Sequence, residues 1–135
     1  MEFQALPYTV RYDQENNVVL GEMFGALTAR EYEDSYIEIL ESDVIPPDTN
    51  ALWDLRNLYF SALDVDFVKS IVAVRKKYRH LRGNAKLAFL VDDEAKKKFM
   101  KLFSTMSEFG DTGQDMRAFY DQTEAINWLR TGQAD

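Results

Sequence analysis

The chain has 135 residues, 46% of them hydrophobic and 29% charged, a composition typical of an ordinary globular protein. Its formal net charge of −7 argues against general nucleic-acid binding, because contacts to phosphates need an excess of cations. The absence of cysteine excludes disulfides, thiolate metal sites and thiol nucleophiles, and it suits a cytoplasmic location.

The first part of the chain predicts a hairpin, a helix and a third strand. Residues 8–12 alternate as a strand does, and a turn-forming segment leads into a return strand over residues 18–25. Thr28 and Glu31 have the spacing of a capping box, so a helix is expected to begin there and to end at a pair of prolines. Residues 51–55 predict the third strand.

The second part of the chain alternates helices with strands. Asp64 is placed to cap a helix that Gly83 ends, and the apolar run 86–91 follows as a strand. Paired aspartates then cap a third helix, residues 116–120 predict the fifth strand, and Asp121 caps a last short helix. The side chains expected on the buried faces of these three helices are Phe67, Ile71, Val74, Tyr78, Leu81, Ala95, Phe99, Leu102, Phe103, Met106, Ala125, Trp128 and Leu129.

The predicted order ββαβαβαβα indicates an α/β fold. The run 86–91 is too short for a membrane span and is bounded by polar residues, which is typical of a strand covered on both faces. Parallel strands joined by right-handed crossovers place helices over the sheet. We therefore expect a single domain over residues 1–135 with a mixed, mostly parallel five-stranded sheet and helices packed on it.

The charges are unevenly distributed along the chain. Residues 1–68 carry three basic and fourteen acidic side chains, whereas residues 69–101 carry eleven basic and three acidic ones. Two interpretations stay open: solvated helix faces, with the lysines of the third helix (96–98 and 101) pointing mostly outward, or a basic face that meets an acidic partner or anionic head groups. An acidic first helix and basic later helices could also pair in a homodimer, or within one monomer.

Few residues point to catalysis. His80 is the single histidine and has no nearby nucleophile, so a surface position is expected, and histidines cannot build a metal site here. The aspartic-protease tripeptide at 111–113 follows a helix and is read as a chance match. Asp54, Asp92 and Asp93 lie near the carboxyl ends of predicted strands, where carboxylates can hold Mg²⁺, act as acid and base, or simply cap helices and loops. No phosphate-binding glycine loop accompanies them.

Three segments resemble the SpoIIAA-like family of bacterial proteins. They are residues 51–57 (ALWDLRN), residues 86–92 (KLAFLVD) and residues 117–129, which begin RAFYD and end EAINWL. The family belongs with the STAS domains and is similar to the CRAL-TRIO lipid-transfer fold. The resemblance spans nearly the whole chain and implies a STAS-like fold and a non-catalytic module that binds a protein partner and needs no cofactor or metal.

The resemblance also implies where such a partner would bind. In anti-sigma antagonists of the STAS class, a serine at the start of the helix after the third strand is phosphorylated. Here Asp64 falls at about that place and Ser61 lies short of it, so a fixed negative charge is expected in place of a phospho-switch. The implied interaction surface consists of Asp54, Arg56, Asn57, Tyr59, Ser61 and Asp64.

The CRAL-TRIO likeness implies an alternative, a carrier or sensor of a lipid or another small apolar ligand. The lysines would then meet an anionic membrane surface peripherally, since no stretch approaches the ~20 apolar residues of a spanning helix and the N-terminus lacks the features of a secretion signal. A third hypothesis is a hydrolase that uses Asp54 with Asp92 or Asp93. The residues expected to line the apolar pocket are Phe67, Ile71, Tyr78, Phe99 and Phe103.

Overall fold

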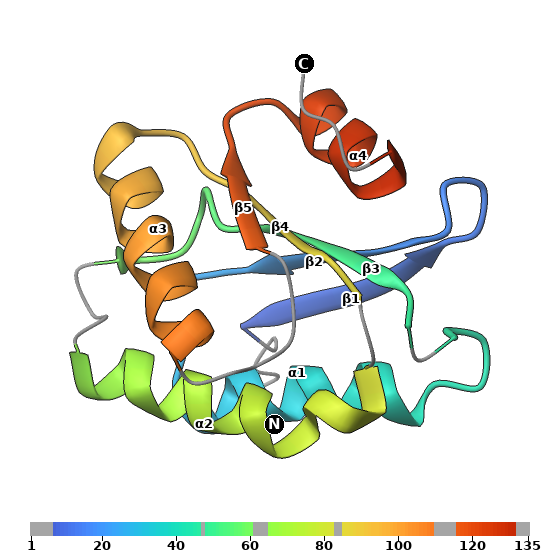
Figure 1. The fold of residues 1–135 in the computed structure, drawn as a ribbon, viewed down its shortest axis with the longest axis horizontal. Coiled ribbons are helices and arrows are strands. Elements are labelled where there is room, and N and C mark those ends of the chain that lie inside the picture. Colours follow the sequence, from blue (N-terminus) through green and yellow to red (C-terminus); the bar gives the residue numbers. More distant parts are fainter. Residues whose placement is uncertain (1–6, 47, 61–64, 83–84, 110–115, 132–135) are drawn as a thin grey trace, which may run out of the picture.

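The computed structural model describes residues 7–46, 48–60, 65–82, 85–109 and 116–131 (Figure 1). They form five strands and four helices in the predicted order, and no helix among them is long and apolar enough to cross a bilayer. In chain order the elements are β1 (Tyr8–Asp13), β2 (Val18–Met23), α1 (Ala29–Glu41), β3 (Asn50–Asp54), α2 (Val65–Arg82), β4 (Leu87–Leu90), α3 (Glu94–Phe109), β5 (Met116–Phe119) and α4 (Gln122–Thr131).

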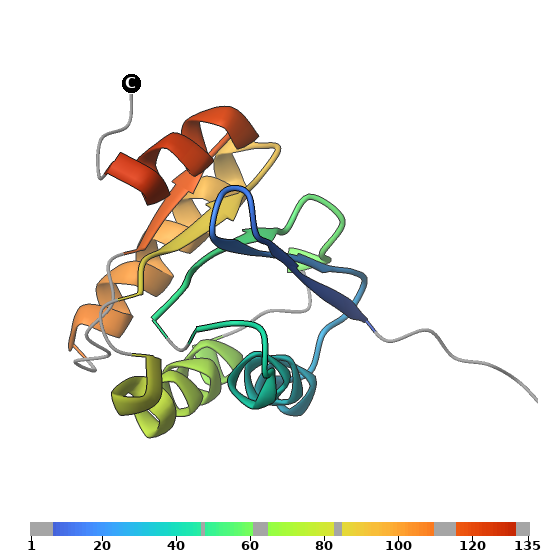
Figure 2. The ribbon, with the colours of Figure 1, turned by 90° about the vertical axis from the view of Figure 1, so that its right-hand side faces the viewer.

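The strands lie in the sheet in sequence order, β1-β2-β3-β4-β5. The pair β1–β2 is antiparallel and the other three pairs are parallel, which confirms the mixed, mostly parallel sheet. Because the chain moves steadily across the sheet from β2 to β5, right-handed crossovers put α1, α2 and α3 on the same face. Helix α4 follows the last strand and covers the opposite face (Figures 1 and 2).

The central strands are buried on both faces. Leu87 and Phe89 of β4 join the larger core under α1, α2 and α3, whereas Ala88 and Leu90 join the smaller core under α4. This alternation follows from the two-residue period of a strand. Burying each large side chain contributes roughly 1.5–3 kcal/mol, so β4 is an important source of stability and its prediction as a doubly covered strand is confirmed.

Gly21 of β2 has no side chain, and this leaves room for Trp53, the largest side chain in the core under α1, α2 and α3. Gly21 lies opposite Trp53 of β3 in the parallel register. A Cβ atom at Gly21 would lie 2.3 Å from Cζ3 of Trp53, whose indole is 5% exposed. The glycine is therefore needed for close packing between the strands.

The starts of α1, α3 and α4 have the capping residues that the sequence predicts, whereas Asp64, the predicted cap of α2, lies outside the described residues. In the capping box, Thr28 Oγ1 accepts from the amide of Glu31 at 3.1 Å and Glu31 Oε1 accepts from the amide of Thr28 at 2.9 Å. At α3, Asp93 Oδ1 accepts from the amide of Lys96 at 2.8 Å. At α4, Asp121 Oδ1 accepts from an amide two residues later at 3.2 Å. These bonds satisfy amides that the first turn of a helix leaves without partners.

Some predicted helix faces are wrong. Leu81 is 45% exposed and Leu102 is 51% exposed, and Ala95 is exposed as well. Helix α3 packs over the edge strand β5, and its buried face is narrower than predicted and centres on Met100 and Phe103. The apolar residues on either side of this face are therefore exposed to solvent. The first helix ends at Glu41, before the prolines, and β2 ends at Met23. Met106 was also expected on the buried face of α3, but its side chain is not among those that the structure describes.

Replacing Gly21 with alanine is expected to lower the free energy of unfolding by about 1–3 kcal/mol, because the new methyl group overlaps the Trp53 ring. Urea denaturation of the wild type and the variant measures this loss. In a Trp53→Leu background the same substitution should cost clearly less, since the ring that causes the overlap is gone. An equal loss in both backgrounds would show that the indole is not the obstacle.

Candidate functional site

The carboxyl ends of β3 and β4 meet at one edge of the sheet. The two strands are parallel, and Asp54, the last residue of β3, lies opposite Leu90, the last residue of β4. Asp92 follows β4 closely, and the loop after β3 begins at Leu55. This is the edge at which open α/β sheets bind ligands.

Asp54 and Arg56 form a closed ion pair at this edge. Nε of Arg56 donates to Oδ1 of Asp54 at 3.0 Å, and Nη2 donates to Oδ2 at 2.8 Å. The backbone amide of Arg56 also donates to Oδ1, at 3.1 Å. Both carboxylate oxygens are therefore occupied by a two-pronged contact of the strong, charge-assisted kind.

Lys96 connects α3 to the loop that follows β3. Its Nζ lies 2.9 Å from Oδ1 of Asp92 and 2.9 Å from the carbonyl oxygen of Arg56, which accepts a hydrogen bond from it. The same nitrogen lies 5.4 Å from the centre of the Phe60 ring. The prediction that Lys96 points outward is wrong, because three electron-rich groups surround its nitrogen and the side chain is only 16% exposed.

Gly25 holds the other side of the loop. Its amide donates to the carbonyl of Asn57 at 3.0 Å, and its carbonyl accepts from the amide of Tyr59 at 2.9 Å. The two bonds form a parallel bridge between Gly25 and Leu58, so the loop continues the sheet by one step. Gly25 has φ +61°, a left-handed conformation that a glycine adopts without strain.

The loop presents a compact exposed surface. The Tyr59 side chain is 64% exposed, the Arg56 side chain is 49% exposed, and Asn57 is exposed beside them. Beneath them, Leu58 is 5% exposed and anchors the loop in the main core. The structure thus brings together four of the six candidates named from the sequence, which are Asp54, Arg56, Asn57 and Tyr59.

The remaining two candidates, Ser61 and Asp64, lie outside the described residues. Gly25 and Lys96 also hold this loop, although no pattern in the sequence points to them. Nothing local signals their role, because Gly25 lies 32 residues before its partner Asn57 and Lys96 lies 40 residues after Arg56.

The edge carboxylates favour the ionised state. For Asp54, partial burial raises the pKa, but the side-chain and backbone hydrogen bonds from Arg56 and its positive charge outweigh burial, so the pKa is lowered. For Asp92, the hydrogen bond from Lys96 lowers the pKa. A general acid at neutral pH needs a raised pKa, so neither group is tuned for that role. Within the described ranges no three acidic or histidine side chains group as metal ligands.

Four of the five predicted pocket residues share one cavity. Phe67 and Ile71 of α2 and Phe99 and Phe103 of α3 line a cavity of about 40 Å³ between these helices and the sheet. Its lining is formed by aliphatic and aromatic side chains. The volume is far below the roughly 300–1,000 Å³ of typical ligand pockets.

Tyr78, the fifth pocket residue, lies where α1 meets α2. Its ring stacks on Tyr36 with ring centres 5.5 Å apart, and its hydroxyl donates to Oε2 of Glu33 at 2.7 Å. Lys77 Nζ lies 3.2 Å from the same oxygen. The hydrogen bond from Tyr78 and then that from Lys77 lower the pKa of Glu33. Opposite charges of α1 and α2 therefore meet within one chain here, and a homodimer through these helices stays a prediction.

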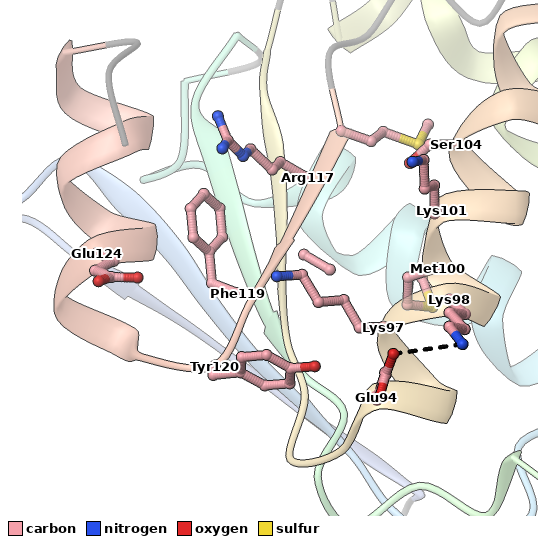
Figure 3. Close-up of a pocket in the computed structure, with 12 residues that line it drawn as sticks. Glu94, Lys97, Lys98, Met100, Lys101, Ser104, Arg117, Phe119, Tyr120 and Glu124 are labelled. Carbon is pink, nitrogen blue, oxygen red and sulfur yellow. Dashed lines mark ion pairs between the residues drawn. The ribbon is translucent and has the colours of Figure 1, made fainter. Parts of the chain in front are cut away.

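A larger groove runs along the edge strand β5. It has a volume of about 640 Å³ and lies between α3, β5 and α4 (Figure 3). Lys98 pairs with Glu94 at 3.4 Å, and Lys97 Nζ lies 4.6 Å from the centre of the Tyr120 ring. Arg117 lies on the α4 side of β5 while the lysines extend from α3, so the cations do not converge on one point (Figure 3).

Replacing Asp54 with asparagine is expected to lower the free energy of unfolding at pH 7 by about 1 kcal/mol or less, because the pair with Arg56 is partly exposed. The carboxyl has its pKa lowered from 3.8 in the folded protein. The contribution of the ionised carboxylate to the free energy of unfolding is therefore complete above about pH 4. It disappears as the pH falls through the lower pKa that the carboxyl has in the folded protein. Thermal unfolding from pH 7 to pH 2.5 should show the two proteins converge only in acid. A constant difference would mean that the charge of Asp54 is not involved.

Comparison with known proteins agrees with this fold. The family model described as SpoIIAA-like matches residues 18–130. A solved structure of an uncharacterized protein of the DUF3478 family from Shewanella loihica PV-4, which has a SpoIIAA-like fold, superposes with a TM-score of 0.64 at 17% sequence identity. The match covers 96% of this chain and 98% of that one. No curated protein matches the chain. By the extent of the family match, the chain belongs to the SpoIIAA-like family and has its STAS-like α/β fold.

Proposed function

We propose that the protein is a regulatory module that binds a protein partner through the loop after β3, and that it acts by binding and not by catalysis. One observation carries the proposal: Lys96 and Gly25 hold this loop from two sides while Tyr59 and Arg56 stay exposed. Tyrosine and arginine are enriched among residues that dominate binding energy at interfaces. A loop already fixed in place loses little conformational freedom on binding.

The state of the edge carboxylates supports binding over the hydrolase hypothesis. Asp54 is paired with Arg56, Asp92 with Lys96, and Asp93 accepts from a backbone amide as the cap of α3. Each carboxylate thus has a structural contact that explains its position. His80, the other group considered for acid–base chemistry, is exposed on α2.

We further propose that this module has no serine phospho-switch. The proposal depends on the family resemblance, in which Asp64 stands at about the place of the switch serine. A carboxylate near the start of α2 would carry a permanent negative charge, which the helix dipole stabilises there. The partner would then recognise one charge state, and its release would need another signal.

Tyr59→Ala is expected to weaken partner binding by roughly 30-fold, the loss that follows when a dominant interface residue is truncated. Tagged protein is used to recover partners from a lysate of the source organism, and the affinity of each recovered protein is then measured. Tyr120→Ala is the matched control, since Tyr120 is 50% exposed at the end of β5.

The partner should be retained by the wild type and by the Tyr120 control, and lost by the Tyr59 variant. Charge reversal in Asp64→Lys should weaken the same partner. Equal affinities for all four proteins would remove this loop as the binding surface.

A second candidate function is the carriage of a small apolar ligand, favoured by the apolar cavity under α2 and α3. Because the cavity measures about 40 Å³, an acyl chain would fit only if the two helices moved away from the sheet. The exposed lysines of α3, Lys97 and Lys98, would then face the head groups of an anionic membrane.

The test of this second function is a fluorescent fatty-acid probe titrated into the wild type and into Val68→Leu. Val68 lines the cavity, so the added methylene group is expected to fill part of it and to lower the probe affinity while preserving stability. Vesicles that contain phosphatidylglycerol, at low salt, provide the membrane measurement. If neither the probe nor the vesicles bind the folded wild type, the carrier hypothesis is wrong.

A further inference from the structure

Arg75 is a buried arginine in the middle of α2. Its exposed fraction is 2%, whereas the next residue along the helix, Lys76, is exposed. Arginine is rarely fully buried unless it is paired, since its guanidinium stays charged at every physiological pH. Its position therefore needs a compensating group.

The protein supplies only part of that compensation. Nη1 of Arg75 donates to the hydroxyl oxygen of Tyr32 on α1 at 3.1 Å. Nε and Nη2 have no hydrogen-bond partner, and no carboxylate pairs with Arg75 in the described part of the chain. The Tyr32 hydroxyl accepts from Arg75 and keeps its own proton to donate. Nε and Nη2, which share one edge of the planar guanidinium, are thus two donors without an acceptor.

A small cavity lies at this place. It has a volume of about 10 Å³ and is lined by Arg75, Tyr32, Ser35 and Trp53, among others, from α1, α2 and the sheet. Such a volume has room for one small species, such as a single water molecule or a monatomic ion. It excludes phosphate, sulfate and fatty acids, which are all much larger.

We propose that this cavity binds a small monovalent anion of about the size of chloride, held by Nε and Nη2 of Arg75. A water molecule would satisfy the hydrogen bonds but leave the positive charge of Arg75 uncompensated among apolar side chains such as Ile39 and Leu87. A halide satisfies the donors and neutralises the charge. The bound anion would then link α1 to α2 and make their packing depend on halide concentration.

The first measurement is thermal stability at constant ionic strength, with sodium chloride exchanged for sodium gluconate. Gluconate is too large for the cavity, so it serves as the ionic-strength control. The unfolding midpoint should rise with the logarithm of the chloride concentration above the Kd, with a gain of about 5–10 °C once chloride exceeds its Kd a hundredfold. A midpoint that is the same in both salts would overturn the proposal.

Trp53 provides a local readout of the same site. It lines the cavity and is 5% exposed, whereas the other tryptophan, Trp128, is buried in the opposite core under α4. In a Trp128→Phe background, bromide should quench Trp53 fluorescence along a saturating curve, because heavy atoms quench on contact. Quenching that stays weak and linear in bromide would mean that no ion reaches Arg75.

Arg75→Met and Lys76→Met separate the buried cation from an exposed one on the same helix. Arg75→Met is expected to abolish both the rise of the unfolding midpoint with chloride and the saturable bromide quenching, whereas Lys76→Met should keep both. If Arg75→Met does not fold, the bromide curve of the Trp128→Phe protein alone decides the question. Retention of both signals in a folded Arg75→Met protein would place the ion elsewhere and overturn the proposal.

Discussion

The central strands β3 and β4 need apolar cover on both faces, and the rest of the architecture follows from that constraint. Every residue of β4 is buried, and three of the five residues of β3 are buried as well. Right-handed crossovers place three helices on one face, so only a helix after the last strand can cover the other. Helix α4 has that role and packs Trp128 and Leu129 against the sheet. The two cores therefore differ in size.

The same topology brings polar groups to one edge. Parallel strands end together, and the loops that lead into α2 and α3 start beside each other there. Because the two loops are adjacent, the ammonium group of Lys96 contacts both Asp92 and the carbonyl of Arg56. The ionic contacts hold the loop but leave Tyr59 exposed. A rigid support with exposed aromatic and guanidinium groups is the arrangement that favours recognition with a low entropic cost.

Local signals in the sequence were sufficient to predict the element order and the starts of α1, α3 and α4. The capping box at Thr28 and the cap at Asp121 depend on residues two or three positions away, so they can be read directly. The periodicity of the sequence predicts an apolar stripe along α3, but it does not predict which side of the helix faces the sheet. For that reason Leu102, which was expected to be buried, is exposed. The rotation depends on the edge strand beneath the helix, which a sequence pattern does not contain.

Long-range contacts explain what the sequence could not predict about the site. Lys96 and Arg75 belong to residue types that are usually exposed, and their burial depends on partners 40 and 43 residues away. Asp54 and Arg56 could be named because they adjoin a recognisable strand. The contribution of Gly25 could not, since it follows from a bridge between distant segments.

The edge strand β5 has a consequence for how copies of this protein behave when crowded together. Its outer row of backbone amides and carbonyls adjoins no further strand in the described sheet, and such a row is a template for cross-β stacking. The strand has only four residues, and Lys97 and Arg117 line its groove. Two copies that approached edge to edge would bring like charges together before their backbones could pair. Charged side chains beside an edge strand, and an edge of only four residues, both disfavour such backbone pairing between copies.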